Sequence, residues 1–237
     1  MDLSVDLSVV LPCFNERLRL PSTLEAVRGF LDRRGDVYEV VLVDDGSDDG
    51  TLDLLRAFER AASNVRVVSL WPNQGKGRAV AEGVRVTQGA RVLMADADLS
   101  TPIGELERLE DALDAGADVA IGSRAAPGSQ MLDQAFYRVV MGKTFNVIVR
   151  LAMLPDFRDT QCGFKLFRGA VARDLFGRLR TSGFAFDVEI LWHAQGAGYA
   201  VAEVPVRWRA SDSSRVAPLR HSGQMLRDLV RLRMRLR

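Results

Sequence analysis

Short apolar runs alternate with longer amphipathic segments through the first half of the chain. The runs are rich in Val and Leu and show little polar alternation, which is typical of strands covered on both faces of a sheet. They comprise residues 7–13, 38–43, 65–70, 91–95 and 118–122.

The amphipathic segments between these runs predict helices. One opens at Ser22, where Ser22-Thr23-Leu24-Glu25 has the capping-box pattern. Others follow residues 48–49 and the glycines of 73–77, and one opens at Thr101-Pro102, with proline at the first helical position. Strand–helix alternation of this length predicts right-handed βαβ units and a mostly parallel sheet flanked by helices.

The second half is less regular. We expect a helix over 133–153, a strand over 164–167, helices over 170–176 and 187–195, and a strand over 199–208 as an edge or mixed element. Near the end, apolar residues recur at helical spacing among arginines, which predicts a basic amphipathic helix. The apolar positions are Met225, Leu229, Leu232 and Leu236. The predicted organisation is one main domain over 1–216 and this helix over 217–237.

Composition narrows the class of protein. The chain has 237 residues, 47% hydrophobic and 27% charged, which suits one folded domain and excludes disorder. Its two cysteines, Cys13 and Cys162, are far apart in sequence, which favours a reducing compartment. We see no signal-peptide pattern, and the most apolar stretch, 145–154, is shorter than the roughly 20 residues that span a bilayer. We therefore expect a cytoplasmic protein, peripheral at the cytoplasmic membrane face.

The charge is uneven along the chain. The net charge is +1, yet the segment from Arg215 to the end holds seven Arg and one acid, Asp228. Such a tail favours an anionic partner surface. Two alternatives stay open: the helix docks on a membrane, or it packs on the domain with its arginines in water. A nucleic-acid-binding module would explain the tail but not the acids described next, which would repel phosphates.

Polar clusters follow three of the first four apolar runs. Asp96-Ala97-Asp98 comes directly after 91–95, and ligands of open parallel sheets bind beyond the carboxyl ends of strands. Two carboxylates one residue apart suit one Mg²⁺ or Mn²⁺, which would neutralise a diphosphate leaving group. The alternative is that these acids cap the next helix.

The other two clusters suit a nucleoside. Asp44-Asp45-Gly46-Ser47 follows the second run, and Pro12-Cys13-Phe14-Asn15-Glu16 ends the first. A carboxylate here can accept hydrogen bonds from the base or ribose of a nucleoside. The alternative is that these residues form a turn and the N-cap of the next helix. Two glycines and a lysine at 75–77 precede a helix and can favour an anion, without Walker A spacing; the alternative is a flexible turn.

Together these motifs resemble glycosyltransferase family 2, in its order and roughly its spacing. They are Pro12-x-x-Asn15-Glu16, Asp44-Asp45-Gly46-Ser47, Asn73-x-Gly75-Lys76-Gly77 and Asp96-x-Asp98. The stretches 159–165 and 186–189 are similar to the dolichyl-phosphate β-glucosyltransferase and polyprenyl-phosphate glycosyltransferase branch.

The resemblance implies a GT-A (Rossmann-like) fold, a nucleotide-sugar donor and inversion at the anomeric carbon. It implies that the nucleotide-sugar is bound by Pro12, Asn15, Glu16, Asp44, Asp45, Gly75, Lys76, Asp96 and Ala97, and the metal by Asp96 and Asp98. It further implies catalytic roles for Arg124, Asp159, Lys165 and Asp187, and acceptor binding by Glu189, Ser214 and Arg215. For each of these acids, an N-cap or a salt bridge is the alternative.

The expected reaction transfers a sugar, preferably glucose from UDP-glucose, to a polyprenyl or dolichyl phosphate. A lipid phosphate is already an anionic nucleophile and needs no general base, whereas a hydroxyl acceptor would need Asp187 or Asp159 as base. Alternatives are a GDP-mannose donor, a soluble or saccharide hydroxyl acceptor, or nucleotide-sugar binding without turnover. Ser100 stands where mannose-transferring relatives usually have Gln, which favours a UDP-sugar.

Overall fold

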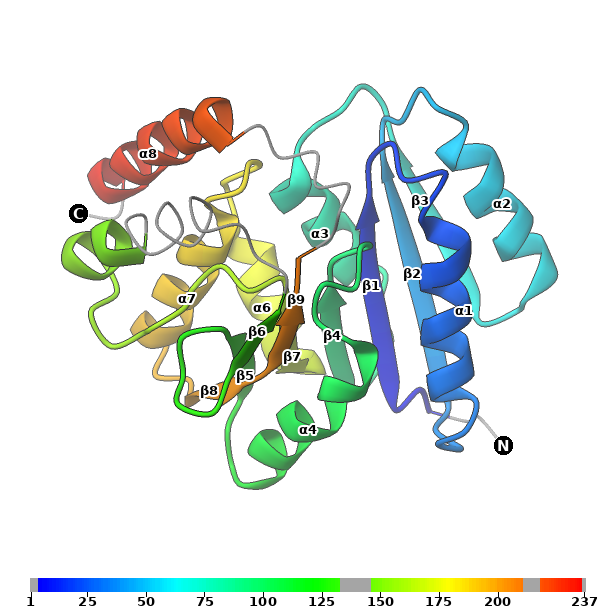
Figure 1. The fold of residues 1–237 in the computed structure, drawn as a ribbon, viewed down its shortest axis with the longest axis horizontal. Coiled ribbons are helices and arrows are strands. Elements are labelled where there is room, and N and C mark those ends of the chain that lie inside the picture. The colour runs from blue at the N-terminus through cyan, green and yellow to red at the C-terminus, as the bar shows by residue number, and fades with distance from the viewer. Residues whose placement is uncertain (1–3, 133–145, 211–217, 236–237) are drawn as a thin grey trace.

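The computed structural model describes residues 4–132, 146–210 and 218–235. Its centre is a seven-stranded sheet with strand order β3-β2-β1-β4-β7-β5-β8 (Figure 1). The strands are β1 (Leu7–Cys13), β2 (Tyr38–Asp45), β3 (Val65–Leu70), β4 (Arg91–Ala95), β5 (Val119–Ser123), β7 (Phe164–Arg168) and β8 (Val201–Pro205). β7 runs antiparallel to both neighbours and all other pairs are parallel. The predicted mostly parallel sheet is confirmed.

Helices cover both faces of the sheet. One face packs on α1 (Leu20–Leu31), α2 (Thr51–Ala61) and α4 (Leu106–Asp114), and the other on α3 (Lys76–Arg85), α6 (Gly169–Arg178) and α7 (Phe186–Gly196). Successive strand residues alternate between the two layers, so Val9 lies in the first core and Val10 in the second. The strands are therefore apolar on both faces, which is why the sequence shows continuous Val and Leu runs.

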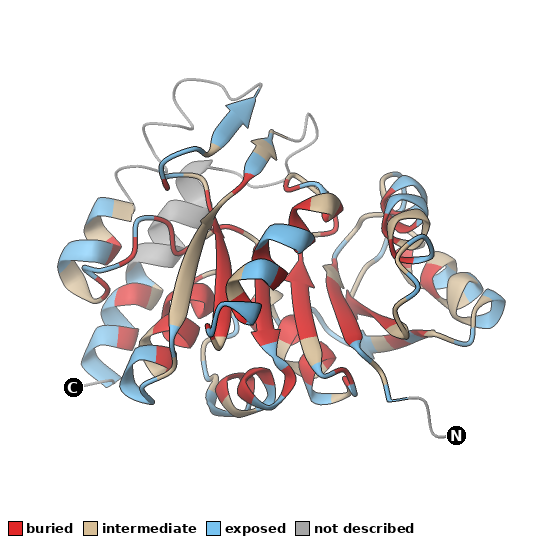
Figure 2. Cartoon of the chain, turned by 90° about the horizontal axis from the view of Figure 1, so that it is seen from below, coloured by how far each residue is buried: buried red, intermediate tan, exposed pale blue. Residues whose placement is uncertain are grey.

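A small two-stranded sheet lies outside the main one. It pairs β6 (Gln130–Leu132) with β9 (Arg207–Arg209) and is largely exposed (Figure 2). The prediction of one strand over 199–208 is wrong, because the segment divides at Val206 into β8 and β9. Pro205 has no N–H to continue the ladder, and the next residue turns inward and is buried.

Two predicted helix starts are also wrong. α1 begins at Leu20, and the Ser22 hydroxyl donates to the Arg19 carbonyl (2.8 Å) instead of capping the helix. The fixed φ of Pro21 suits the first turn, so the helix starts before the apparent capping box. Pro102 precedes a 3₁₀ turn, η1 (Ile103–Glu105), that leads into α4.

The C-terminal segment forms α8 (Pro218–Arg235). Leu229 and Leu232 are buried in the core layer that also contains α7 residues, so this face of α8 packs on the domain. The side chains of Met225 and Leu236, and the helix expected over 133–145, lie outside the described residues; 146–152 is helical. Within the part of the chain that the structure describes, no helix combines the length and apolar character needed to cross a bilayer.

Candidate active site

The carboxyl ends of β2, β1 and β4 lie side by side, because these strands are neighbours in that order and run parallel. The loop after β1 is tied to the loop after β2. Asn15, at φ 57°, donates its backbone N–H to the Ser47 hydroxyl (2.9 Å) and accepts from the Asp48 N–H (2.9 Å). Glu16 forms an ion pair with Arg19 (2.6 Å). In this structure the polar groups of Asn15 and Glu16 therefore stabilise the loops that follow β1 and β2.

Asp44, at the end of β2, has one carboxylate oxygen that is open to a ligand. Its side chain is buried, and Oδ2 accepts from the Ser47 N–H (3.3 Å). Its Oδ1 is buried and has no hydrogen-bond partner among the described residues. A buried carboxylate oxygen is costly to leave unpaired, so Oδ1 is suited to accept from a ligand N–H or hydroxyl.

Asp45 fixes the glycine loop instead. Its two oxygens accept from the N–H groups of Gln74 (2.7 Å) and Gly75 (2.9 Å). Burial raises its pKa, and these two hydrogen bonds only partly oppose that shift. The carboxylate is thus committed to positioning residues 73–75.

The glycines of this loop permit close backbone approach. Gly75 has φ +98°, and a Cβ there would lie 2.6 Å from the Ser182 carbonyl oxygen. The same carbonyl accepts from the N–H of Gly77 (2.7 Å) and of Arg78 (3.3 Å) at the start of α3. These backbone N–H groups already donate within the protein, so an anion at this loop would depend on the Lys76 ammonium, and anion binding here stays a prediction.

Lys76 brings α3 against the acid pair after β4. Its Nζ lies 2.6 Å from Asp96 Oδ1. Burial lowers the pKa of Lys76, but Asp96, Asp187 and Asp98 outweigh that effect and the net shift is upward. Asp98 Oδ1 accepts from the Ser100 N–H (2.9 Å), and the Ala97 carbonyl accepts from the Thr23 hydroxyl (2.6 Å). The acid pair is therefore anchored to α1 on one side and α3 on the other.

A buried ion pair borders this cluster. Lys165 Nζ lies 2.5 Å from Asp187 Oδ1 and donates to the Cys162 carbonyl (2.6 Å). Both side chains are almost fully buried. Burial raises the pKa of Asp187, although Lys165 and Lys76 lower it in part. Lys165 comes from β7 and Asp187 from the first turn of α7, so the pair joins the antiparallel strand to the helix layer.

A second ion pair lies at the end of β5. Arg124 binds Asp159 through Nε (2.7 Å), Nη2 (2.9 Å) and its backbone N–H (2.9 Å). Burial alone would raise the pKa of Asp159, but the guanidinium charge and its hydrogen bonds lower it to about 2. The Arg124 guanidinium also faces the Trp208 ring at 5.7 Å. This pair therefore keeps a fixed carboxylate and a fixed cation beside the small sheet.

The glycosyltransferase family 2 model matches residues 8–176. The chain belongs to glycosyltransferase family 2. It is 36% identical to a dolichyl-phosphate beta-glucosyltransferase of Dictyostelium discoideum, over 98% of this chain and 75% of that one. The enzymes of the same name from Drosophila melanogaster and Homo sapiens are 39% and 35% identical, covering 95% and 97% of this chain and 74% and 75% of theirs.

Solved structures share the fold at lower identity. Glucosyl-3-phosphoglycerate synthase from Mycobacterium tuberculosis, in complex with Mn²⁺ and UDP-glucose, has a TM-score of 0.71 at 19% identity, covering 97% of this chain and 79% of that one. Mannosyl-3-phosphoglycerate synthase from Rubrobacter xylanophilus has a TM-score of 0.73 at 19% identity, covering 99% and 75%. These likenesses support the predicted GT-A fold of a family 2 glycosyltransferase.

The acid cluster of this glycosyltransferase fits a divalent cation. Asp96, Asp98 and Asp187 outnumber Lys76 and Lys165 by one negative charge, and Asp96 Oδ1 already binds one cation, the Lys76 ammonium, at 2.6 Å. No group of three or more His, Cys, Asp or Glu suited to a metal occurs in the described ranges. The protein would thus supply two carboxylates, which suits Mg²⁺ or Mn²⁺ that also binds diphosphate oxygens and water.

Not every predicted residue joins this cluster. Glu189 points to the loop before α7, where it accepts from the N–H groups of Arg180 (3.1 Å) and Thr181 (2.8 Å) and pairs with Arg235 (3.1 Å). Ser214 and Arg215 lie outside the described residues. Pro12 lies within β1, and the residue after it pairs with Asp44.

Three positioning residues escaped sequence reasoning. A Cβ at Gly163 would overlap the Asp96 carboxylate, so only glycine fits there. Glu203 accepts from the N–H groups of Arg158 and Asp159 (both 2.9 Å) and places the latter carboxylate. Thr23 holds the Ala97 carbonyl. Only Glu203 carries a visible signal, as an acid inside an apolar strand.

Proposed function

We propose that this protein transfers glucose, with inversion, from UDP-glucose to a polyprenyl or dolichyl phosphate, and that it requires Mg²⁺ or Mn²⁺. The donor and acceptor are those suggested by the names of relatives that match 95% or more of the chain. The neighbour solved with Mn²⁺ and UDP-glucose is consistent with the same donor and metal class.

Each residue that would contact the nucleotide-sugar has a separate role in this proposal. Asp44 Oδ1 accepts from the nucleoside, and Asp98 with Asp96 holds the cation. When bound, the cation neutralises charge that develops on the departing diphosphate. Lys76, at the start of α3, supplies a second positive charge for the diphosphate or holds Asp96 in place until the donor arrives.

One observation favours a phosphate over a hydroxyl acceptor: both candidate bases are held by cations. Asp159 has a pKa near 2 and is paired with Arg124, so it is a poor proton acceptor at neutral pH. Asp187 shares its Oδ1 with the Lys165 ammonium at 2.5 Å. A phosphate oxygen needs no proton removed, so positioning and charge neutralisation suffice.

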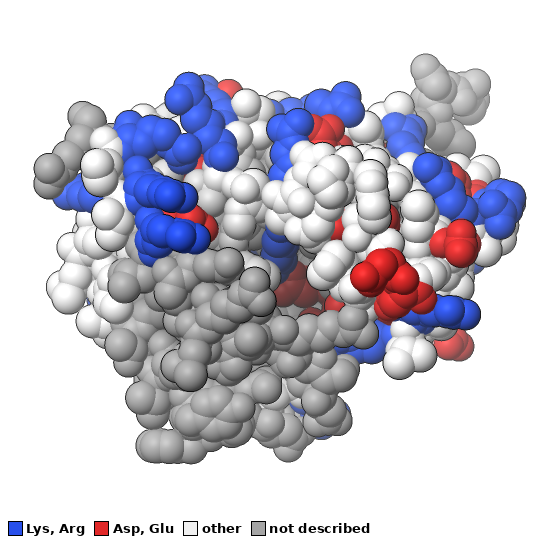
Figure 3. All heavy atoms as spheres, turned by 90° about the horizontal axis from the view of Figure 1, so that it is seen from above, with Lys and Arg blue, Asp and Glu red and all other residues white. Residues whose placement is uncertain are grey.

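We propose that the protein binds the membrane surface through the exposed face of α8. Lys and Arg side chains gather over the end of the molecule that carries this helix (Figure 3). Its outward face exposes Arg227, Arg231 and Arg233 with Val230 and Met234. Such a surface suits the interface of an anionic bilayer, with about 1 kcal/mol gained per basic residue. The protein would then act from the cytoplasmic membrane face.

The proposal is tested by donor and acceptor specificity. Purified protein is incubated with labelled UDP-glucose or GDP-mannose, a short polyprenyl phosphate and Mg²⁺ or Mn²⁺, and then extracted with organic solvent. We expect label in the organic phase from UDP-glucose, and none after chelation of the metal. UDP release with a soluble hydroxyl acceptor but no lipid label would contradict the acceptor assignment.

Substitution tests the metal assignment. Asp98→Ala should lower kcat by roughly 10²-fold or more, the scale of losing a group that stabilises transition-state charge. Asp111→Ala, on the exposed surface of α4, is the matched control and should retain the wild-type rate. A wild-type rate for Asp98→Ala in the presence of metal would remove Asp98 from the metal site.

A further inference from the structure

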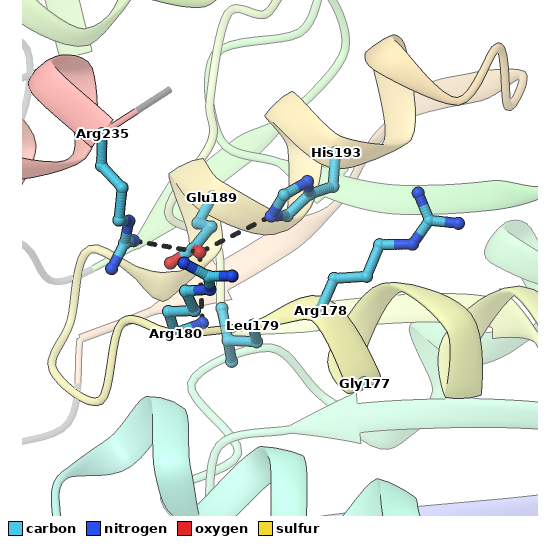
Figure 4. A pocket seen from close by; sticks show the side chains of 7 residues that line it. All are labelled: Gly177, Arg178, Leu179, Arg180, Glu189, His193 and Arg235. Carbon is cyan, nitrogen blue, oxygen red and sulfur yellow. Dashed lines mark hydrogen bonds and ion pairs between the residues drawn. The ribbon is translucent and has the colours of Figure 1, made fainter. Parts of the chain in front are cut away.

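A separate cavity lies between α6, α7 and α8. Its volume is about 470 Å³, within the range of small-molecule sites. It is lined by Arg178, Arg180, Arg235, His193 and Glu189, with Gly177 and Leu179 (Figure 4). None of these residues belongs to the strand-end cluster of the candidate active site.

The cavity carries surplus positive charge. Glu189 is neutralised by Arg235 (3.1 Å) and by two backbone N–H groups, and Arg178 is paired with Asp174 (2.7 Å). Arg180 has no carboxylate within ion-pair distance among the described residues, and its contact to Glu189 is through the backbone N–H alone. His193 also lines the cavity, and its Nε2 lies 3.5 Å from Glu189 Oε1.

We propose that this cavity is a second anion site, which binds a phosphate monoester. Arginine side chains present forked donors that match phosphate oxygens, and Arg180 and Arg235 come from different elements around one space. The single acid, Glu189, has its charge compensated and does not repel the anion. The phosphate is carried either by a lipid headgroup or by a free solute.

The site is connected to the candidate active site through one loop. Glu189 holds the backbone of Arg180 and Thr181, and the next carbonyl, that of Ser182, accepts from Gly77 and Arg78 at the start of α3. Lys76, which contacts Asp96, begins the same helix. An anion bound at Arg180 therefore lies beside the loop that positions Lys76.

The test is calorimetric titration of inorganic phosphate into the full chain, with UDP and Mg²⁺ present so that the donor site is filled. Arg180→Ala should weaken phosphate binding on the order of tenfold or more, as expected for losing a charged hydrogen-bond donor. Arg60→Ala removes an exposed arginine of α2 that does not line the cavity and should bind as wild type. Circular dichroism and thermal unfolding confirm that both variants fold.

Two results would overturn the proposal: no measurable phosphate binding by the wild type, or equal binding by Arg180→Ala and Arg60→Ala. Vesicles of phosphatidylcholine containing phosphatidic acid or phosphatidylserine then separate the sources. A lipid headgroup predicts that Arg180→Ala selectively loses binding to phosphatidic acid. A free solute predicts that the two variants bind both vesicles alike, while inorganic phosphate still requires Arg180.

Discussion

Asp159 shows how the charge state of one residue is fixed by its neighbours. The Arg124 guanidinium binds both of its oxygens, and Glu203 holds its backbone N–H. The folded-state pKa of about 2 lies below the unfolded value near 3.9. The folded state therefore binds fewer protons, so this group stabilises the fold above pH of about 4 and loses that contribution as pH falls towards about 2.

The consequence is a pH-dependent stability difference. Asp159→Asn removes the contribution, worth roughly 2 kcal/mol at neutral pH. We expect the gap in unfolding free energy between wild type and variant to be largest near neutrality and to shrink as the pH is lowered, measured by urea titration. The exposed control Asp111→Asn should show no such trend. A gap that stays constant with pH would contradict the assigned pKa.

At residue scale, the sequence predicts which acids gather but not what they contact. Asp96 and Asp98 are found by their place after a strand, because strand ends of a parallel sheet share one edge. The partners depend on tertiary contacts that no spacing reveals. Asp45 accepts from two backbone N–H groups of the glycine loop, and Glu189 accepts from the loop before α7. Neither contact is visible in the sequence, and the predicted ligand contacts of both residues stay predictions.

Helix α3 is positioned by its first turn rather than by a capping side chain. Gly75 is its N-cap with no side-chain hydrogen bond, and the Ser182 carbonyl accepts from the helix N-terminus. A Cβ at Gly77 would overlap the Thr181 carbonyl and lie 2.7 Å from Phe186 Cβ. The glycine is therefore needed for the approach of two segments far apart in sequence.

Gly77→Ala should push the start of α3 away from the loop that contains Thr181 and Ser182. We expect a loss of roughly 1–3 kcal/mol in unfolding free energy from overpacking, together with a lower kcat because Lys76 moves with the helix start. Gly196→Ala is the matched control, since a Cβ at this helical position meets no atom within 4 Å. It should be neutral or up to about 1 kcal/mol more stable. Equal stabilities and rates for the two variants would show that the close approach at Gly77 has no effect.

At the scale of the whole molecule, the pattern predicts the layers better than the order of strands. Buried strands of either direction show the same apolar run, so the antiparallel β7 between β4 and β5 leaves no trace in the pattern. Where 199–208 divides between two sheets, Glu105 from a distant turn accepts from the Arg207 guanidinium at 2.5 Å. Long-range contacts of this kind are absent from local periodicity.

The packing of α8 on the domain limits which of its faces can meet a membrane. Its apolar stripe was expected either to enter a membrane or to pack on the domain, and Leu229 and Leu232 pack on the domain. Deleting α8 would therefore remove the candidate membrane-binding face and two buried core residues at once. Any membrane contact must use the opposite face, where Met234 is 73% exposed.

Two single substitutions separate these effects. Met234→Glu should reduce sedimentation with anionic vesicles several-fold, because it places a negative charge on the exposed face, while unfolding free energy changes by less than about 0.5 kcal/mol. Leu232→Ala should instead lower unfolding free energy by about 2–5 kcal/mol, because it leaves a cavity in the core, with vesicle binding of the folded fraction retained. If Met234→Glu binds vesicles as wild type does, α8 serves the domain core alone and membrane access requires another surface.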